Sequence, residues 1–381
     1  LSSIADYVTD KISSNDIALR EYVTTDCILQ NKKGREIATN LPPQSCCLTR
    51  YQRGDVLIAN IRPYLKKVWF ADIDGGASSD VLVFRAKEGH SPSFLYAVLL
   101  QDSFFDYVMQ GAKGSKMPRG DKEQILRYEM PTLSCSEESI GTFFLNLDKK
   151  IRLNEQINQN LEAMAKQLYD YWFVQFDYPD ENGKPYKSSG GKMVWNEKLK
   201  REIPEGWKDI TLNAFIDKNK GGDWGYDTPK DGTIKVGCVR GADIIKLNDV
   251  PTRHITSKHS DRLLEDGDIV IEISGGSPVQ ATGRVALITK GVIERNEGAL
   301  VCSNFCQSFS MKKRTYSEYF YYLWRNLYDN DNMFNFEGKT SGIKNFQTDV
   351  FLANHWFEAQ EQLIEKFHVI VSQYHLMIDQ N

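Results

Sequence analysis

The stretch FFLNLDKKIRLNEQINQNLEAMAKQLYDYWF, residues 143–173, determines how the rest of the chain is interpreted. Its apolar residues recur at alternating intervals of four and three, which is the spacing of a coiled-coil helix. Because no Gly or Pro occurs between Gly141 and residue 175, we expect one long helix over about residues 136–175. The seam has two interleaved series: Ile140, Leu147, Asn154, Leu161 and Leu168, and Phe144, Ile151, Asn158, Ala165 and Trp172.

Asn154 and Asn158 occupy the middle of this apolar seam. A buried amide in a coiled coil must meet a hydrogen-bonding partner, so it restricts register and helix orientation. We therefore predict that both asparagines are register markers. The alternative is a helix that lies on its own domain and turns these amides toward solvent.

The C-terminal stretch LIEKFHVIVSQYHLMI, residues 363–378, offers a matching seam of Ile364, Phe367, Val371, Tyr374 and Ile378. We expect the two helices to pack antiparallel and to separate two globular domains. From Ile140 to Trp172 an α-helix spans roughly 50 Å, whereas one turn of B-DNA is about 34–36 Å. Two domains on such a spacer could read separated major-groove segments on one face of a duplex.

Length and composition limit the class of protein. With 381 residues, of which 41% are hydrophobic, the chain is long enough for two or more domains. The formal net charge of -4 means that any nucleic-acid contact must come from local basic loops. The seven cysteines form no C-x-x-C pair, and no membrane-length apolar run occurs, which favours a reduced, cytoplasmic location and no membrane partner.

The fold class that these patterns predict is α+β, with two duplicated domains of mixed α/β structure separated by an antiparallel coiled coil of two long helices. Strands are expected at 56–61, 81–84, 268–273 and 284–288, and helices at 93–109, 317–328 and from about 357 to the end. The predicted domains are a first domain at 1–133, a central long helix at 134–175, a linker at 176–207, a second domain at 208–354 and a C-terminal helix at 355–381.

Four pairs of similar segments occur in the same order in the two halves, which indicates a diverged repeat. Two unrelated α+β domains with chance matches are the alternative. The pairs are GDVLI (54–58) with GDIVI (267–271), SFLYAVL (93–99) with EYFYYLW (318–324), GSKMPRGD (114–121) with GIKNFQTD (342–349), and 139–154 with 363–378, which aligns Phe143 with Phe367.

Sequence motifs for catalysis are absent. The chain has no phosphate-binding glycine loop, no dinucleotide-binding turn, no H-E-x-x-H and no G-x-S-x-G. Cys302 and Cys306 have no second pair or nearby histidine, so we expect buried thiols rather than zinc ligands. The segment LPPQ (41–44) lacks the residues of an adenine-methylase motif, and Pro179-Asp180 lacks the spacing of a nuclease. We expect no catalytic residue and no bound metal.

Several local basic loops favour DNA binding instead, although each could be only a solvated surface. GAKGSKMPRGDK (111–122) and its counterpart EGKTSGIKN (337–345) combine cations with glycines that permit close backbone approach. Arginine and asparagine can also read base edges in the major groove. The candidate DNA-binding residues are Lys113, Lys116, Arg119, Lys122, Arg62, Tyr64, Lys66, Lys67, Lys218, Lys220, Trp224, Arg253, Lys258, Lys339, Lys344 and Asn345.

The sequence resembles the specificity (S) subunit of Type I restriction-modification systems. The resemblance is carried by residues 147–173 and 176–207, by SNDIALREYVTTDCIL (14–29), by 53–84 and by GKTSGIKNF (338–346). It implies two target recognition domains, each reading one half of a bipartite, double-stranded DNA site, and helices that dock methyltransferase (M) subunits.

The resemblance further implies that S-adenosylmethionine, ATP and Mg²⁺ are used by the M subunits and by a restriction (R) subunit, with no cofactor bound by this chain. The target base would be flipped into the M subunit, which agrees with the missing motifs. Two other classes remain open: a fused nuclease or methylase enzyme, and a coiled-coil adaptor that binds proteins without DNA.

Overall fold

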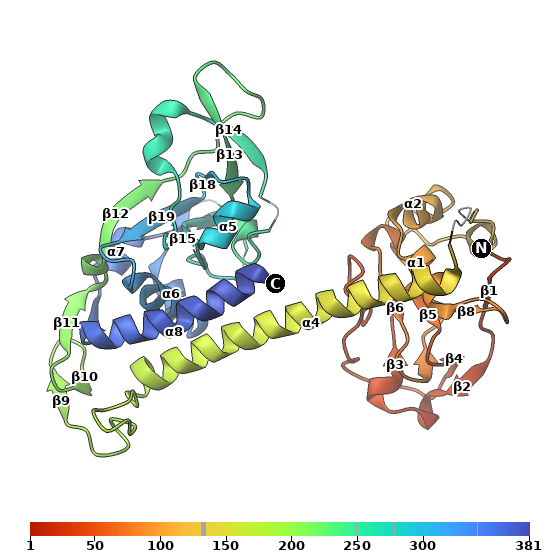
Figure 1. Ribbon diagram of the computed structural model, residues 1–381, viewed down its shortest axis with the longest axis horizontal. Coiled ribbons are helices and arrows are strands. Elements are labelled where there is room, and N and C mark those ends of the chain that lie inside the picture. The colour runs from red at the N-terminus through yellow and green to blue at the C-terminus, as the bar shows by residue number, and fades with distance from the viewer. Residues whose placement is uncertain (131–134, 249, 278, 341) are drawn as a thin grey trace. The chain divides into compact units, whose positions relative to one another are not determined.

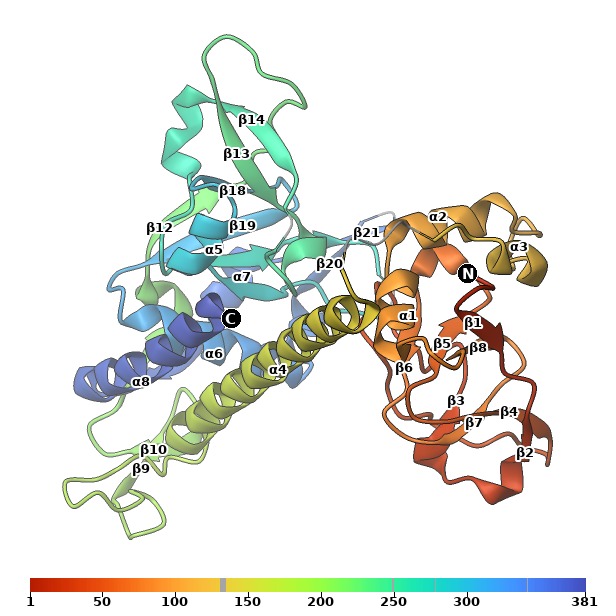
Figure 2. The same ribbon diagram turned by 45° about the vertical axis from the view of Figure 1, so that its right-hand side comes forward.

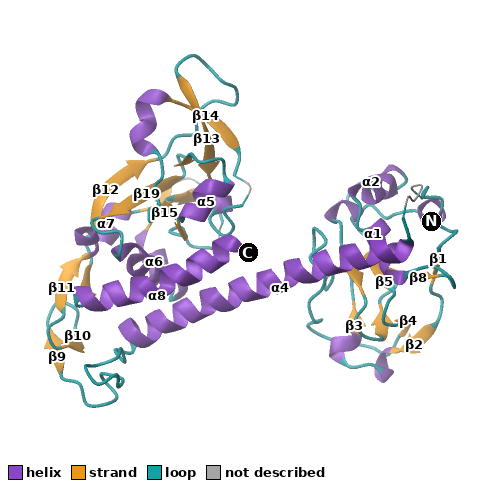
Figure 3. Ribbon diagram, viewed as in Figure 1, coloured by secondary structure: helices purple, strands orange, loops and turns teal. Residues whose placement is uncertain are grey.

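The computed structural model describes residues 1–130, 135–248, 250–277, 279–340 and 342–381. The chain forms two compact units, Leu1–Asn154 and Glu155–Asn381 (Figure 1). Both units combine helices with strands, so the expected mixed architecture is confirmed (Figure 3). The long helix α4, Glu137–Tyr169, contributes residues to both units, and the expected border at residues 133 and 134 lies outside the described residues.

The first unit is built on two four-stranded sheets. The main sheet has the order β1-β8-β5-β6, with every pair antiparallel. The second sheet has the order β2-β4-β7-β3, with β3 parallel to β7. The strands are β1 Ala5–Tyr7, β2 Lys11–Ser13, β3 Tyr22–Val23, β4 Cys47–Tyr51, β5 Val56–Ala59, β6 Val68–Phe70, β7 Gly75–Ala77 and β8 Val81–Ala86.

The central strand β5 is apolar throughout because it is buried on both faces. Val56 and Ile58 belong to the core under α1, whereas Leu57 belongs to a second core around Trp69. The single helix expected at 93–109 is two helices, α1 Pro92–Leu99 and α2 Asp102–Gln110. The chain is extended at Gln101, with ψ 143°, and the acidic Asp102 then begins α2, where carboxylates are favoured.

The second unit repeats this main sheet. Its order is β12-β19-β15-β17, again with every pair antiparallel. In the central strand, Ile269 and Ile271 face one core while Val270 faces another, as in β5. The strands are β12 Ile216–Gly221, β15 Ile269–Glu272, β17 Val285–Leu287 and β19 Cys306–Met311. The segments GDVLI and GDIVI therefore lead into equivalent strands.

Smaller sheets and further α-helices complete the second unit. The helices are α5 Lys290–Arg295, α6 Tyr316–Asp329, α7 Thr348–Leu352 and α8 Glu361–Gln380. One sheet has the order β14-β13-β18 and contains β13 Thr233–Val239, β14 Thr252–Thr256 and β18 Leu300–Cys302. Another sheet has the order β16-β21-β20 and contains β16 Ser274–Gly275, β20 Glu337–Thr340 and β21 Ile343–Phe346. Two strand pairs are β9 Met193–Asn196 with β10 Arg201–Pro204, and β11 Lys208–Thr211 with β22 His355–Glu358.

The segment expected as a linker, 176–207, is folded into the second unit. It contains the β9–β10 hairpin, and four of its residues are buried in the main core: Phe176, Tyr178, Ile203 and Trp207. The expected C-terminal helix is also shorter at its start, because His355–Glu358 form β22 and α8 begins at Glu361. Residues 355–358 are extended rather than helical because β22 pairs with β11.

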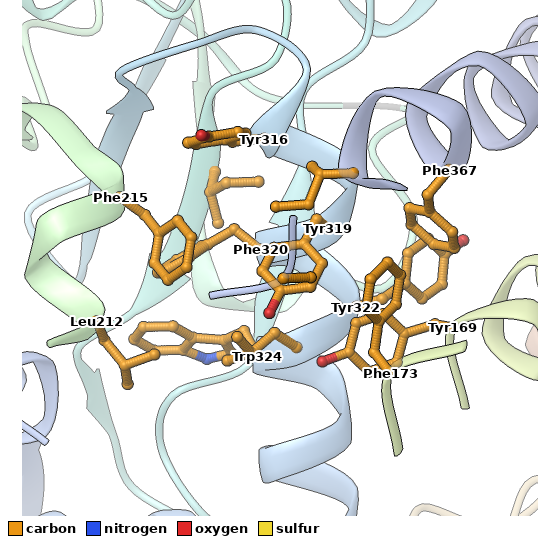
Figure 4. Close-up of a cluster of buried hydrophobic side chains, with 14 of the residues drawn as sticks. Tyr169, Phe173, Leu212, Phe215, Tyr316, Tyr319, Phe320, Tyr322, Trp324 and Phe367 are labelled. Carbon is orange, nitrogen blue, oxygen red and sulfur yellow. The ribbon is translucent and has the colours of Figure 1, made fainter. Parts of the chain in front are cut away.

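Within the second unit, α8 lies beside the C-terminal part of α4 and runs in the opposite direction (Figures 1 and 2). The Phe367 ring lies 5.2 Å from the Phe173 ring and 6.1 Å from the Trp172 ring, while Asn381 at the other end of α8 donates to Asn158 at 2.8 Å. Figure 4 shows Phe367 among Tyr169, Phe173 and Tyr322 in this aromatic core. Trp172 and Phe173 are both buried because α4 ends in a wider π-helical turn, Asp170–Val174.

The predicted seam is covered over only part of α4. Leu161, Ala165 and Trp172 are buried, but Leu147 and Ile151 are 43% and 59% exposed. Leu147 and Ile151 lie beyond Asn158, the residue that α8 reaches. Phe143 is likewise 59% exposed, whereas Phe367, with which the repeat aligns it, is fully buried.

Candidate nucleic-acid interface

A glycine–aspartate turn starts the central strand in each unit. Gly54 and Gly267 have φ +93° and +91°, a conformation that favours glycine. In the first unit the backbone amide of Gln52 donates to the Asp55 carboxylate at 2.8 Å. In the second unit the backbone amide of Glu265 donates to the Asp268 carboxylate at 2.8 Å. The two turns thus place β5 and β15 by the same hydrogen bonds.

Different cations neutralise these two buried aspartates. Arg85 donates to both oxygens of Asp55, at 2.8 and 2.7 Å. Lys220 donates to Asp268 at 2.8 Å and to the Leu263 carbonyl at 2.9 Å. Lys220 is only 6% exposed, so its expected role as a DNA contact is wrong for this structure: its ammonium group is already held inside the unit.

In the first unit, the residues after β5 pair with the basic loop 111–120. The backbone amide of Arg62 donates to the Pro118 carbonyl at 2.8 Å, and the backbone amide of Gly120 donates to the Asn60 carbonyl at 3.3 Å. Within the loop, Lys113 and Arg119 exchange two backbone hydrogen bonds of 2.9 Å. We call this arrangement of residues 60–62 and 113–120 the first ribbon.

In the second unit, the residues after β15 form an equivalent second ribbon, consisting of β16, β20 and β21. Ser274 pairs with Asn345, Gly275 pairs with Lys344, and the Phe346 amide donates to Ile273 at 2.8 Å. Hydrogen bonding therefore matches Arg119 with Asn345. The repeat alignment matched Arg119 with Gln347 instead, so it is displaced by two residues at this point.

Exposed cations line the first ribbon. The Arg119 side chain is 59% exposed, and its Nη2 lies 3.1 Å from Asp80. Lys113 lies 2.9 Å from Asp121, and this hydrogen bond lowers the pKa of Asp121, which also caps α3, Lys122–Leu126. Lys116 and Lys122 are exposed.

The basic segment 62–67 is more constrained. Arg62 adopts the left-handed conformation with φ 54°, and Tyr64 is 49% exposed. Lys66 lies 2.6 Å from Asp102, and hydrogen bonds from Lys32 and Lys66 lower the pKa of Asp102 to about 2. Lys67 donates to the Thr25 carbonyl at 2.6 Å, which makes it a structural contact in this state.

Side chains of the second ribbon are held in place by polar contacts. Lys344 lies 2.9 Å from Glu337 and above the Phe334 ring at 5.2 Å. Burial raises the pKa of Glu337, but hydrogen bonds from Thr282 and Lys344 outweigh it, so the carboxyl titrates below its usual range. Asn345 is exposed and accepts a hydrogen bond from Ser274 at 2.7 Å. The side chain of Lys339 lies outside the described residues.

A third group of candidates lies around β12 and β14. Lys218 and Lys258 are exposed, and Trp224 is 39% exposed. Arg253, by contrast, is 7% exposed and paired with Asp227, so it is not a free phosphate contact as expected. Sequence reasoning missed Tyr226, which is 43% exposed beside Trp224; two aromatic residues flanking Gly225 were the available signal.

The two seam asparagines are half-buried. The Asn158 side chain accepts from that of Asn381 at 2.8 Å, which links α4 to the end of α8. Their role in setting register stays a prediction.

Chemistry at other sites is limited in the described part of the chain. No group of three or more His, Cys, Asp or Glu residues there is arranged to hold a metal ion. Burial raises the pKa of the Cys238, Cys302 and Cys306 thiols to about 12, so they are not thiolates at neutral pH. Among the described helices, none combines the length and the apolar character that crossing a membrane requires.

Comparison with known proteins gives two sequence relatives and a fold match, although no family model matches the chain. The chain is 24% identical over 214 residues to the Type I restriction enzyme MjaIX specificity subunit of Methanocaldococcus jannaschii, covering 55% of this chain and 45% of that protein. It is 30% identical over 169 residues to the Type I restriction enzyme HindI specificity subunit of Haemophilus influenzae, covering 41% of this chain and 36% of that protein. The matches thus span less than half the length of either relative.

The structure of a Type I restriction-modification S subunit from M. genitalium matches over the whole chain. The TM-score is 0.55 with 14% identity, and the match covers 100% of this chain and 89% of the other. The chain is therefore similar in sequence to Type I restriction enzyme specificity subunits and has the fold of one.

Proposed function

We propose that this chain is the non-catalytic DNA-recognition subunit of a Type I restriction-modification complex. The observation that carries the proposal is the pair of equivalent ribbons, each attached to the central strand of its own unit. Two similar scaffolds that carry different side chains, Arg119 in one and Asn345 in the other, suit the reading of two different DNA half-sites. Exposed lysines beside the first ribbon would contact phosphates.

The long helices would supply the spacer and a docking surface. Contacts of Phe367 with Phe173 and of Asn381 with Asn158 support an antiparallel coiled coil of α4 and α8. Along α4, Phe144 and Leu147 are exposed apolar residues one turn apart, which suits a helix or groove of a methyltransferase subunit. Methyl transfer with S-adenosylmethionine, and ATP- and Mg²⁺-dependent cleavage, would belong to the methyltransferase and restriction subunits.

A methylation experiment tests the proposal. The full-length chain would be produced together with a Type I methyltransferase subunit and given random-sequence duplex DNA, and the methylated adenines would be mapped by sequencing. We expect a consensus of two parts separated by a gap of fixed length. Methylation without such a split consensus would contradict the proposal.

Variants of one ribbon sharpen this test. Replacing Lys116 and Arg119 by Ala should relax one part of the consensus and leave the other unchanged, because the second ribbon is untouched. Lys208→Ala, which removes an exposed lysine on β11, is the matched control and should change neither part. Equal relaxation of both parts would argue against separate readers.

A further inference from the structure

Several polar contacts fix the loop Gly222–Asp227 to its unit. Arg253 donates through Nε to the Trp224 carbonyl at 2.8 Å and through Nη2 to the Gly225 carbonyl at 3.3 Å, and it also pairs with Asp227. At the start of the loop, Arg262 donates to the Gly222 carbonyl at 2.9 Å. Four polar groups of the loop are thus held by two arginines.

The loop backbone is equally constrained. Tyr226 and His254 exchange two backbone hydrogen bonds of 2.8 and 3.0 Å, which join the loop to β14. Asp223 contacts the His259 Nδ1 atom at 2.6 Å and accepts from the Gly225 amide at 2.9 Å. A Cβ atom on Gly225 would lie 2.6 Å from the His254 carbonyl oxygen, so this close approach requires glycine.

These contacts hold two aromatic rings at the surface. Trp224 is 39% exposed and Tyr226 is 43% exposed, whereas Trp324 in the same unit is fully buried. Each ring has a cation on it: the Arg253 guanidinium lies 4.4 Å from the Trp224 ring centroid, and the Lys230 ammonium lies 3.7 Å from the Tyr226 ring centroid. Exposure alone does not assign a role, since Trp195 on β9 is 54% exposed; Trp224 and Tyr226 differ in that hydrogen bonds hold their loop in place.

We infer that Trp224 and Tyr226 form a stacking platform for a DNA base that has left the duplex stack. Aromatic faces bind bases of any identity. Lys230, exposed beside the Tyr226 ring, adds attraction for the DNA backbone, whereas the buried Arg253 holds the loop. Since the loop is already ordered, little conformational entropy is lost when a base binds. The inference rests on the proposed function and adds to it a distortion of the DNA at the second unit.

The experiment measures binding of the full-length chain to a duplex enriched by selection from random sequence, and to a 30-base oligo-dT. Replacing Trp224 and Tyr226 together by Ala should weaken binding to both probes by about 10- to 100-fold, and aromatic replacements by Phe should restore most of it. The matched control is Trp195→Ala, because Trp195 is a 54% exposed tryptophan on β9 of the same unit and should have no effect.

Two further readouts separate stacking from other roles. The dependence of log K on log salt should keep its slope in the double Ala variant, because no phosphate contact is lost, whereas loss of a phosphate contact lowers the slope by about 1. 2-Aminopurine placed along the enriched duplex should show one position whose fluorescence changes with the wild-type chain and not with the variant, because leaving the duplex stack and stacking on the rings both alter its emission. Unchanged affinity of the variant, or a reduced salt slope, would overturn the platform. A wild-type chain that binds neither probe would instead refute the proposed function.

Discussion

At the scale of single residues, buried charges determine how the second unit holds its main sheet. Lys220 on β12 and Asp268 before β15 have side chains that are 5% and 3% exposed, and Ser310 of β19 donates to the same carboxylate at 2.7 Å. Three strands therefore meet at one aspartate. Removing one partner of a buried ion pair leaves the other charge desolvated and without compensation, which is more costly than the pair itself.

Asp268→Ala should therefore destabilise the chain by about 3–5 kcal/mol, because it leaves the Lys220 ammonium buried. Lys220→Met should cost less, since Asp268 keeps the Ser310 hydroxyl and the Glu265 amide as donors. Urea unfolding measures both changes, with Lys258→Ala, an exposed lysine, as control. If Lys220→Met also lowered the salt slope of DNA binding by about 1, Lys220 would be a phosphate contact after all.

A second residue-scale property is acid sensitivity at His375 on α8. Burial against α6 lowers the pKa of His375 below 6.5. The Tyr322 Oη lies 3.4 Å from the His375 Nε2, and the Tyr321 ring lies beside the imidazole. The charged groups around it are Glu318, Asp379, Arg314 and Arg325. Below about pH 6.5 the unfolded chain binds a proton at His375 more readily than the folded chain does. The free energy of unfolding that the neutral, buried His375 contributes is therefore present above about pH 6.5 and is lost as the pH falls below that value.

His375→Gln should therefore flatten the dependence of the unfolding temperature on pH between about pH 6.5 and 5, where one proton changes stability by at most about 1.4 kcal/mol per pH unit. Gln373→Ala, at an exposed position of α8, provides the comparison and should keep the wild-type dependence, because it changes no titratable group. A parallel fall in both variants would assign the acid sensitivity to other groups.

At the scale of elements, the crossing of α4 over α1 depends on one missing side chain. A Cβ atom on Gly141 would lie 2.2 Å from Ser93 Oγ and 2.4 Å from the Phe94 amide nitrogen. Glycine is unfavourable in a helix interior, so close packing is the physical reason for its presence here. Ile140 and Leu145 pack against the same core from this part of α4.

Gly141→Ala should destabilise the first unit by about 1–3 kcal/mol through overpacking, despite the better helix propensity of alanine. Asn146→Ala, on an exposed position of the same helix, should be neutral or slightly stabilising. Hydrogen exchange of α1 and α4 amides would locate the change. Greater stability of Gly141→Ala would show that the two helices can separate without cost.

The sequence predicted elements well where one period extends over many residues, as in α4, α6 and α8, or where an apolar run is buried on both faces, as in β5 and β15. It failed where partners are remote. Lys220 stands in a run of charged and polar residues that is typical of a surface, and its partner Asp268 lies 48 positions away. The polar composition of 176–207 likewise hid the buried Trp207, because composition does not show which few side chains turn inward.

At the scale of the whole molecule, the proposed spacer predicts a relation between helix length and DNA site. Inserting seven residues of matching heptad pattern after Lys150 would lengthen α4 by about 10 Å and keep the same helix face. The gap between the two DNA half-sites should then grow by about three base pairs, because base pairs rise by about 3.4 Å. Sequencing of methylated sites measures the gap, and a five-residue insertion, which turns the helix face by about 140°, is the informative comparison.

The wide turn that ends α4 has a consequence for how such chains can diverge. A π-helical turn holds one residue more than the α-helical turn that it replaces. Deleting Tyr171 would therefore let the end of α4 close into regular α-helix, while Leu161 and Ala165 keep their buried positions. A gain or loss of one residue is consequently absorbed at this turn, and chains with this helix can diverge in length there without turning the face that α4 presents to α8.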